Sequence, residues 1–355
     1  MALGRRGEER QGELWVNAAR LPKSVGHVFY EKLDSLLREA GFDRWVEDLC
    51  TPYYADNRGR PSIPPGTYFR MLLVGYFEGL DSQRGIAWRC ADSLSLRKFL
   101  GLAMGEESPD HSSLSVIRRR LPPQTHEAMF QWVLGLARVR KLLGEGSVKL
   151  GVDSTFLEAN AAMKSIVRKD TGDDWKQYVK KLMVEAGEIT PEDAPPDDEL
   201  RKFDRQRKDK QVSNAEWKSP VDEDSRIMKM KDGRTHLAYK AEHAVDLDSG
   251  LILAAEVYYA DEGDPQTLED SVHTAQVNLT AAGGGSIRDV AVDKGYHSGE
   301  VLETFAEETD YRLYASEKKL PEGRHPRWKG KSEARRRAVR NNARRARGDH
   351  GRALQ

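Results

Sequence analysis

Two short runs of alternating apolar and polar residues, each ending in an aspartate, constrain the fold of this chain most. The first run is 148–154 and the second is 290–297; Asp153 and Asp293 both fall on the polar phase of the alternation. Because successive side chains of a strand point to opposite faces, each aspartate is expected on the polar face at a strand end. If the two strands pair in one sheet, the two carboxylates emerge side by side.

Such a pair of carboxylates on a rigid sheet suits a hard cation such as Mg²⁺. Two-metal phosphoryl transfer uses carboxylates that bridge and flank two metal ions. Paired carboxylates also carry out glycoside hydrolysis, but no aromatic sugar-stacking groove is marked in the sequence. No obvious third acidic ligand follows, and the nine histidines lack the paired spacing of a zinc site.

The charge of the chain is balanced overall but very uneven. The 355 residues have a formal net charge of zero, yet residues 318–355 contain fourteen Lys or Arg and only three acidic residues. A cationic segment of this density attracts polyanions such as nucleic-acid phosphates. Two isolated cysteines, Cys50 and Cys90, do not form a disulfide framework, and no signal-like or membrane-spanning run is present, so we expect a cytoplasmic protein.

The apolar spacing divides the chain into regions of different character. Residues 1–140 follow a helical pattern and contain a helix-turn-helix candidate, with helices at 71–80 and 83–91 and Asp81 or Ser82 as the cap of the second. Short antiparallel helix pairs are also common in purely structural bundles. A further helix is expected to start at Asp110.

Residues 146–317 are expected to form a mixed α/β sheet with flanking helices, interrupted by a polar, partly helical and partly disordered insertion at 155–232. Residues 318–355 form a basic, Arg-rich tail that we expect to be disordered, or helical only against a partner. The expected elements after the insertion are a hairpin at 237–247 and 251–259, a helix at 265–278, a glycine linker at 283–285, a helix at 299–308 and a strand at 311–315.

Several motifs in these regions resemble one known family. Gly151–Thr155, Asp232–Lys240 and Val292–Ser298 closely resemble segments of the DDE transposases of bacterial insertion sequences, whose catalytic domain is ribonuclease-H-like. In the N-terminal region, Tyr76–Gly85 and Ser108–Leu114 resemble the helical, DNA-contacting domain of the same group. The Asp-Lys-Gly-Tyr run that starts at Asp293 is the most specific of these motifs.

The resemblance implies roles for individual residues. Asp153 matches the first catalytic aspartate and Asp293 the second, and both would bind Mg²⁺. The third ligand of the family is a Glu on a helix after the last strand, beyond an Arg-rich stretch. In this chain the only Glu after Gly323 is Glu333, which precedes the arginines instead of following them. We therefore expect the chain to be truncated just before the third ligand.

The resemblance also implies partners: double-stranded DNA, both as terminal inverted repeats and as target, and a second copy of the chain in a homodimer on paired ends. The localisation it implies is the bacterial cytoplasm, in association with the nucleoid. The residues expected to contact DNA are Lys294, Arg335, Arg336, Arg337, Arg340, Arg344 and Arg345.

Other polar residues have simpler interpretations. His297 is equally compatible with a phosphate contact and with an ordinary strand-end histidine. Arg234, Lys240 and His243 are expected to face solvent on or near the hairpin, and Asp264 is expected to cap a turn.

The hypothesis is therefore a transposase that binds the ends of its insertion sequence and catalyses Mg²⁺-dependent DNA cleavage and strand transfer. The sequence leaves two alternatives open. One is a DNA-binding protein without catalysis that inhibits a full-length transposase, and the other is a ribonuclease-H-like, metal-dependent nuclease.

Overall fold

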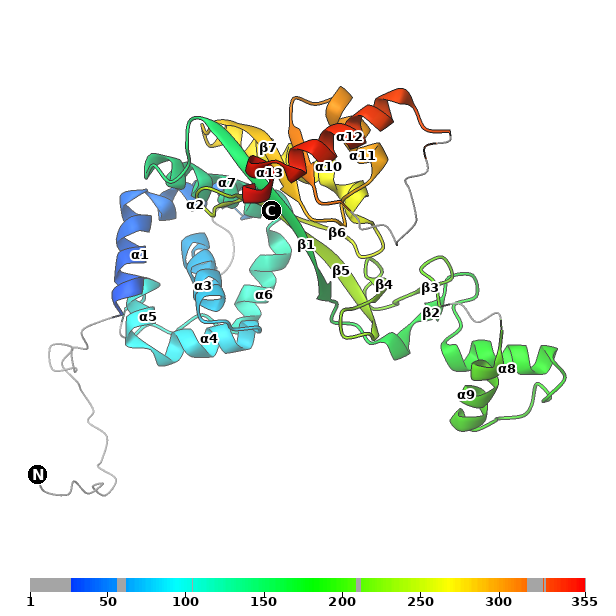
Figure 1. The fold of residues 1–355 in the computed structure, drawn as a ribbon. Coiled ribbons are helices and arrows are strands. Elements are labelled where there is room, and N and C mark those ends of the chain that lie inside the picture. The colour runs from blue at the N-terminus through cyan, green and yellow to red at the C-terminus, as the bar shows by residue number, and fades with distance from the viewer. Residues whose placement is uncertain are drawn as a thin grey trace, which may run out of the picture. The chain divides into compact units, whose positions relative to one another are not determined.

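The computed structural model describes residues 27–55, 62–103, 105–208, 212–317, 328 and 330–354. The chain divides into two compact units, Met1–Trp132 and Val133–Gln355. Each unit has its own arrangement of secondary structure (Figure 1).

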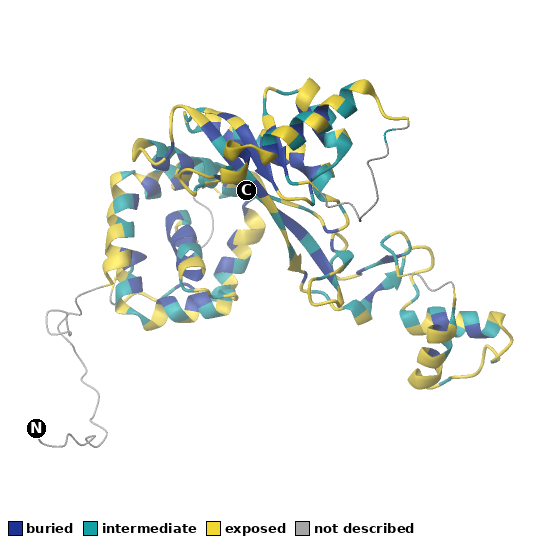
Figure 2. Cartoon of the chain, viewed as in Figure 1, coloured by how far each residue is buried: buried dark blue, intermediate teal, exposed yellow. Residues whose placement is uncertain are grey.

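The first unit is helical. Its elements are α1 (Val28–Glu39), α2 (Phe42–Cys50), η2 (Thr51–Tyr53), α3 (Pro65–Phe77), α4 (Gln83–Asp92), α5 (Leu94–Phe99), α6 (His111–Arg120) and α7 (Pro123–Val139), the last of which runs across the unit boundary. Helix α3 contains buried residues along most of its length (Figure 2). It is therefore the helix around which the others of this unit pack.

A buried arginine joins four of these helices. Arg70 on α3 is 4% exposed, and its guanidinium lies 4.9 Å from the centre of the Phe99 ring. Nε and Nη2 donate to the Asp43 carboxylate at 3.1 and 2.9 Å, and Nη1 donates to Asp34 Oδ1 at 2.8 Å and to the Phe99 carbonyl at 3.0 Å. A buried charge is tolerated when its donors are satisfied in this way.

Two expected helix starts in this unit, at Gln83 and after Asp110, are confirmed, whereas the helix expected at 71–80 begins earlier, at Pro65, and ends at Phe77. Ser82 caps α4, because its hydroxyl accepts from the Gly85 amide at 3.0 Å, and the preceding turn passes through Gly79 with a φ of 64°. Asp110 caps α6 by accepting from the Ser112 amide at 2.7 Å, and hydrogen bonding by Ser112 lowers the pKa of Asp110 to about 2. The α3–α4 pair has the helix-turn-helix order of elements.

The second unit is built on a six-stranded mixed sheet with the path β4-β5-β1-β7-β8, and β6 also pairs with β5. β1 pairs antiparallel with β5 and parallel with β7, and β7 pairs parallel with β8. This arrangement, with helices α10, α11 and α12 around it, is consistent with the expected ribonuclease-H-like fold (Figure 1). Its strands are β1 (Ser147–Glu158), β4 (Arg226–Lys229), β5 (Thr235–Asp246), β6 (Ile252–Tyr259), β7 (Ser286–Val292) and β8 (Arg312–Ala315), and its helices are α10 (Asp264–Ala281), α11 (Gly299–Glu307), α12 (Glu333–Arg347) and α13 (Asp349–Leu354).

The insertion is shorter and more structured than the range 155–232 expected from the sequence. β1 continues to Glu158 and β4 already begins at Arg226, so both ends of the predicted insertion belong to the main sheet. Between them lie η3 (Met163–Ser165), β2 (Val167–Arg168), α8 (Trp175–Glu185), α9 (Asp197–Gln206) and β3 (Trp217–Lys218). Two small apolar clusters, around Trp217 and Val179, lie within this polar segment and contribute to its order.

The expectation of a tail that is disordered or partner-dependent is wrong for α12, which packs against α11 and β8 of the same chain. Ala338, Asn342 and Ala346 repeat at four-residue spacing and form its buried face. The Asn342 side chain accepts from the Ala315 amide at 3.0 Å and donates to the Ala315 carbonyl at 2.9 Å. It thereby satisfies backbone hydrogen-bonding groups of the edge strand β8 that a neighbouring strand would otherwise pair with. Residues 318–327 of the predicted tail lie outside the described residues.

We predict that replacing Arg70 destabilises the first unit. Arg70→Met should lower the free energy of unfolding by about 3 kcal/mol, the lower end for a broken buried ion pair, because the Asp43 side chain keeps 45% exposure and can rehydrate. Arg38→Ala is the matched control, since Arg38 pairs with the same Asp34 but is 67% exposed, and should cost about 0.5 kcal/mol or less. Urea unfolding followed by circular dichroism measures both; equal losses would contradict the role given to Arg70.

A second prediction concerns the edge of the sheet. Asn342→Ala should lower the free energy of unfolding by about 2 kcal/mol, because it leaves the buried amide and carbonyl of Ala315 without partners. Asn341→Ala is the control, because it removes an identical side chain from the neighbouring position, about 100° away around the helix. A cost for Asn342→Ala no larger than for Asn341→Ala would show that α12 does not cap β8.

Candidate active site

The two aspartates singled out by the sequence lie on neighbouring strands. In the parallel pair formed by β1 and β7, Val152 lies opposite Val292, so the next residues, Asp153 and Asp293, lie side by side where this pairing ends. Asp293 follows the end of β7 as expected, but the expected strand end is wrong for Asp153, because β1 continues to Glu158 in its pairing with β5. Both are exposed, and both line an open pocket of about 540 Å³. The strand pairing on which the sequence argument depended is therefore present.

A β-bulge sets this register. Val148 pairs with Ile287, whereas Lys149 pairs with Asp289, so β7 has one extra residue, Arg288, at this point. If the pairing continued without the bulge, Val152 would lie opposite Ala291. Asp153 would then lie beside an apolar residue instead of Asp293.

A backbone amide holds each carboxylate. Asp153 Oδ1 accepts from the Ser154 amide at 2.8 Å, and Asp293 Oδ1 accepts from the Gly295 amide at 2.6 Å. Within the described part of the chain neither carboxylate has an ion-pair partner. Each therefore remains available to an external cation.

Gly295 is required by the space around it. A Cβ at this position would lie 2.8 Å from Asp293 Oδ1 and 2.5 Å from Asp264 Oδ2, closer than side-chain carbons approach such atoms. The glycine of the Asp-Lys-Gly-Tyr run thus permits two carboxylates to lie on either side of the turn. The tyrosine that follows, Tyr296, is 1% exposed and is directed into the protein.

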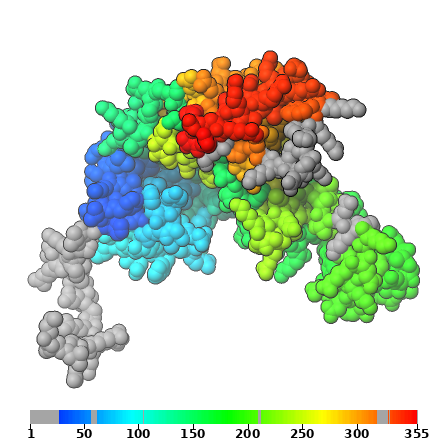
Figure 3. All heavy atoms as spheres, in the orientation of Figure 1, coloured from blue at the N-terminus to red at the C-terminus, as the bar shows by residue number. Residues whose placement is uncertain are grey.

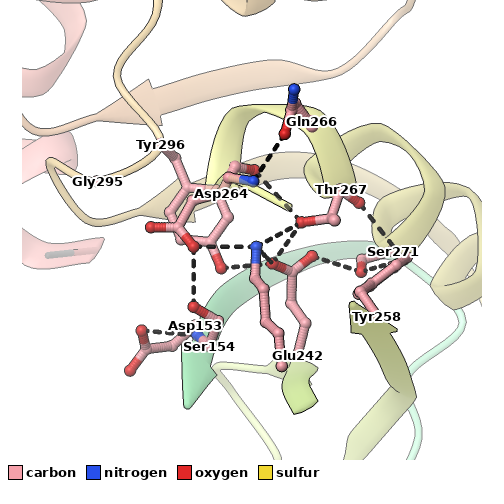
Figure 4. Close-up of polar contacts among 12 residues, drawn as sticks. Asp153, Ser154, Glu242, Tyr258, Asp264, Gln266, Thr267, Ser271, Gly295 and Tyr296 are labelled. Carbon is pink, nitrogen blue, oxygen red and sulfur yellow. Dashed lines mark hydrogen bonds and ion pairs between the residues drawn. The ribbon is translucent and has the colours of Figure 1, made fainter. Parts of the chain in front are cut away.

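The hydroxyl of Tyr296 lies in a buried polar cluster (Figure 4). Its hydroxyl donates to Glu242 Oε2 at 2.7 Å, and Lys240 Nζ lies 3.3 Å from the same oxygen. Burial and the neighbouring Glu242 raise the pKa of Tyr296 far above its usual range, and burial raises the pKa of Tyr258, on the other side of the cluster, to about 12. Both tyrosines are therefore neutral hydrogen-bond donors at neutral pH.

The expectation of solvent-facing residues on the hairpin is wrong for Lys240, whose side chain is fully buried, and holds for Arg234, which is exposed before β5. His243 is half-buried; it pairs with Asp153 across β1 and β5 and lines the same pocket. The alternation along the strand indicated on which face of the sheet these residues lie. It did not indicate that α10 covers the face that carries Lys240. The expectation that Asp264 acts as a cap is wrong: Gly263 is the N-cap of α10, and Asp264 is the first residue of the helix, with its carboxylate in an ion pair with Lys240 at 3.0 Å.

Two further residues follow Asp293. Lys294 is exposed directly beside it. His297 is half-buried, and its Nε2 is enclosed without a hydrogen-bond partner among the described residues. The end of the chain also reaches the pocket, since Leu354 of α13 is one of the residues that line it.

No third carboxylate completes the pair in the described part of the chain, which contains no group of three His, Cys, Asp or Glu side chains able to hold a metal ion. Asp264 Oδ1 is occupied by Lys240 and by the Ser154 hydroxyl at 3.0 Å. Glu333 is exposed at the start of α12 and pairs with Arg340 at 3.6 Å. Two carboxylates open to solvent still fit Mg²⁺, which often takes one or two protein carboxylates and completes its shell with water and substrate phosphates.

The arginines expected to contact DNA fall into two groups on α12. Arg335 pairs with Glu303 at 2.6 Å, Arg336 donates to the Trp328 carbonyl at 2.8 Å, and Arg345, half-buried, donates to the Leu313 carbonyl at 3.2 Å. Burial lowers the pKa of Arg345. These three stabilise the packing of α12.

The second group is exposed. It contains Arg337, Arg340 and Arg344, and the exposed Arg347, which was not among the expected residues, continues the same three- and four-residue spacing; we call these four the α12 arginine stripe. Helices α12 and α13 lie at the surface, in red in Figure 3. Arg337 pairs with Glu307 at 3.4 Å and Arg347 with Glu317 at 2.6 Å, whereas Arg344 has no ion pair among the described residues.

Comparisons with known proteins agree with this architecture. Residues 19–120 match the family model described as Transposase domain (DUF772), and residues 195–350 match the model described as Transposase DDE domain. The second match includes Asp293, while Asp153 lies before it. No curated protein and no solved structure matches the chain. Among the described residues, no helix is both long and apolar enough to cross a membrane. The two matches, in this order along a chain with a helical unit followed by a mixed sheet, show that it belongs to the DDE transposases, with an N-terminal transposase domain and a C-terminal DDE catalytic domain.

Proposed function

We propose that this transposase binds the terminal inverted repeats of its insertion sequence as a homodimer on paired ends, and that it catalyses Mg²⁺-dependent DNA cleavage and strand transfer. The observation that carries the proposal is the in-register placement of Asp153 and Asp293 at one open pocket. DDE transposases bind DNA and typically use a divalent metal. Asp153 and Asp293 would hold Mg²⁺, which would activate the attacking oxygen and stabilise the leaving oxygen of the phosphodiester.

The residues around the pocket are suited to a polyanionic substrate. Lys294, exposed beside Asp293, offsets the charge of a phosphate that enters the pocket. His243 lies on the strand next to Asp153 and is placed to donate a hydrogen bond to the same phosphodiester. His297 follows on the same turn, but its Nε2 is enclosed and it is not one of the residues that line the pocket, so we assign it no contact with DNA. Lys294 and His243 bind and orient the DNA strand, and the carboxylates carry the charge that the cation requires.

The α12 arginine stripe supplies a second phosphate-binding surface. Its four side chains are exposed along one face of the helix, and the ion pairs of Arg337, Arg340 and Arg347 lie at the surface, whereas Arg335, Arg336 and Arg345 are half-buried against the rest of the chain. Phosphate contacts of this kind fix the position of a protein on DNA without selecting a base sequence. We therefore assign DNA contact to Arg337, Arg340, Arg344 and Arg347, and structural roles to the other three.

A DNA-binding protein without catalysis is the second candidate, favoured by the lack of a three-ligand group in the described part of the chain. Such a protein would use the same arginines and the same helical unit, and it would inhibit an active copy by occupying the element ends. A metal-dependent nuclease of the same fold would cut DNA without joining it. The cleavage experiment distinguishes the three.

We predict that cleavage depends on both aspartates. With Mg²⁺ and a supercoiled plasmid that carries the element ends, Asp153→Asn and Asp293→Asn should each reduce nicking by at least about 100-fold, because loss of a direct ligand exceeds the usual effect of an outer residue. Asp248→Asn, in the exposed hairpin turn, should leave the rate unchanged. Cleavage that survives both substitutions would reject the metal site, tight binding without cleavage would favour the binding-only protein, and cleavage without joined products would favour the nuclease.

DNA affinity should depend on salt through the arginine stripe. Arg340→Gln with Arg344→Gln should reduce the slope of log affinity against log salt by about 2, one for each arginine that no longer neutralises a phosphate. Arg335→Gln should weaken the packing of α12 but leave the slope unchanged, because this side chain is committed to Glu303. Fluorescence anisotropy with duplex DNA between about 50 and 200 mM salt measures the slope; an unchanged slope in the double variant would remove the stripe from the DNA interface.

A further inference from the structure

The buried polar cluster around Tyr296 contains two fully buried charged residues that the proposed function does not use. The Lys240 and Glu242 side chains are both 0% exposed, and neither lines the pocket. We propose that this pair is a positioning device, which fixes the β1 segment that carries Asp153 and the turn that carries Asp293 relative to each other. The proposal rests on the proposed function, because it assigns the two aspartates to one metal site.

Glu242 controls the turn that follows Asp293. Its Oε2 accepts from the Tyr296 hydroxyl at 2.7 Å and from the Thr267 hydroxyl at 2.9 Å, and its Oε1 accepts from the Ser271 hydroxyl at 2.5 Å (Figure 4). Tyr296 lies three residues after Asp293, and Gly295 between them leaves no space for a Cβ. The hydroxyl of Tyr296 therefore anchors the turn from below.

Lys240 controls the residue that follows Asp153. Its Nζ lies 3.0 Å from Asp264 Oδ1 and donates to the Thr267 hydroxyl at 2.8 Å. Asp264 Oδ1 also accepts from the Ser154 hydroxyl at 3.0 Å. Since Ser154 is the neighbour of Asp153 on β1 and pairs across the sheet with Glu242, the same cluster reaches the segments that carry both aspartates.

Stability alone does not explain a charged pair at this place. Charged groups removed from water carry a large desolvation cost, and replacing such a pair by apolar residues is often neutral or stabilising. Here each charge is saturated by hydrogen bonds that lead to Ser154 in β1, to the turn after β7 and to the first turns of α10. Outer residues of this kind orient metal ligands, and their loss commonly weakens metal binding by about 10- to 100-fold.

The test uses two tyrosines of the same cluster in the full-length chain. Tyr296→Phe removes the hydroxyl that leads to the Asp293 turn, whereas Tyr258→Phe removes a hydroxyl that lies 3.0 Å from Ser271 Oγ on the α10 side. Both variants keep the ring; Tyr296→Phe loses a buried hydrogen bond to Glu242, and Tyr258→Phe loses partly buried contacts with Ser271 and the Thr267 carbonyl. A purely structural cluster predicts similar effects of the two substitutions, and a positioning device does not.

The first measurement is hydrogen exchange without metal. Tyr296→Phe should speed exchange of the amides of residues 293–297 by about tenfold or more, the size expected when a hydrogen bond to a buried charge is lost, and Tyr258→Phe should leave them unchanged. Ser154→Ala should have the corresponding effect on residues 153–155. Equal exchange of these segments in Tyr296→Phe and Tyr258→Phe would overturn the proposal.

The second measurement is Mn²⁺ binding by electron paramagnetic resonance. Tyr296→Phe should weaken Mn²⁺ binding by about 10- to 100-fold and Tyr258→Phe by less than about twofold. Unchanged affinity in Tyr296→Phe, with wild-type binding that is abolished by Asp293→Asn, would overturn the positioning role. If the wild-type chain binds no Mn²⁺ but the exchange rates differ as expected, the positioning of the turns is supported and the metal site of the proposed function fails.

Discussion

The parallel pairing of β1 with β7 is the constraint on which the candidate site depends. One extra residue in β7, at Arg288, moves the register so that Asp153 and Asp293 follow a matched pair of valines. The start of the pairing is fixed by close backbone contact, since a Cβ on Gly285 would lie 1.8 Å from the Gly146 carbonyl oxygen. A slip of one residue would turn the side chains of a strand to the opposite face. The glycines interpreted from sequence as a linker therefore belong to the device that aligns the site.

The sequence predicted the helical unit, the hairpin and the phase of both aspartates, because these follow from local periodicity and capping. It did not predict the roles of Lys240 and Glu242. Alternation along β5 shows that these residues share a face but not what covers it, and a charged phase is normally assigned to solvent. Here α10 packs on that face, and its Thr267 and Ser271 supply the hydroxyls that satisfy the buried charges. The β-bulge is likewise invisible to a pattern of period two.

The Arg-rich helix α12 differs from its sequence-based expectation for a related reason. Its composition lacks large apolar residues, so no conventional hydrophobic face is visible, yet Ala338, Asn342 and Ala346 recur every four residues. Small residues allow the helix to approach the edge of a sheet closely, and the one polar member of the set bonds to the backbone of β8. The four-residue spacing was a usable signal. What the sequence could not show was that the edge strand needed an amide partner.

The division of the arginines on α12 connects the fold to DNA binding. Phosphate must compete with Glu307, Glu333 and Glu317 for Arg337, Arg340 and Arg347, and each of these pairs is exposed and therefore weak. Arg344 has no such competitor among the described residues, so it offers its full charge to a phosphate at the lowest cost. Because the same helix caps β8 through Asn342, the basic surface cannot be removed as a separate tail without exposing the edge of the sheet that carries Asp293. Only substitutions within the stripe separate DNA affinity from the integrity of the catalytic unit.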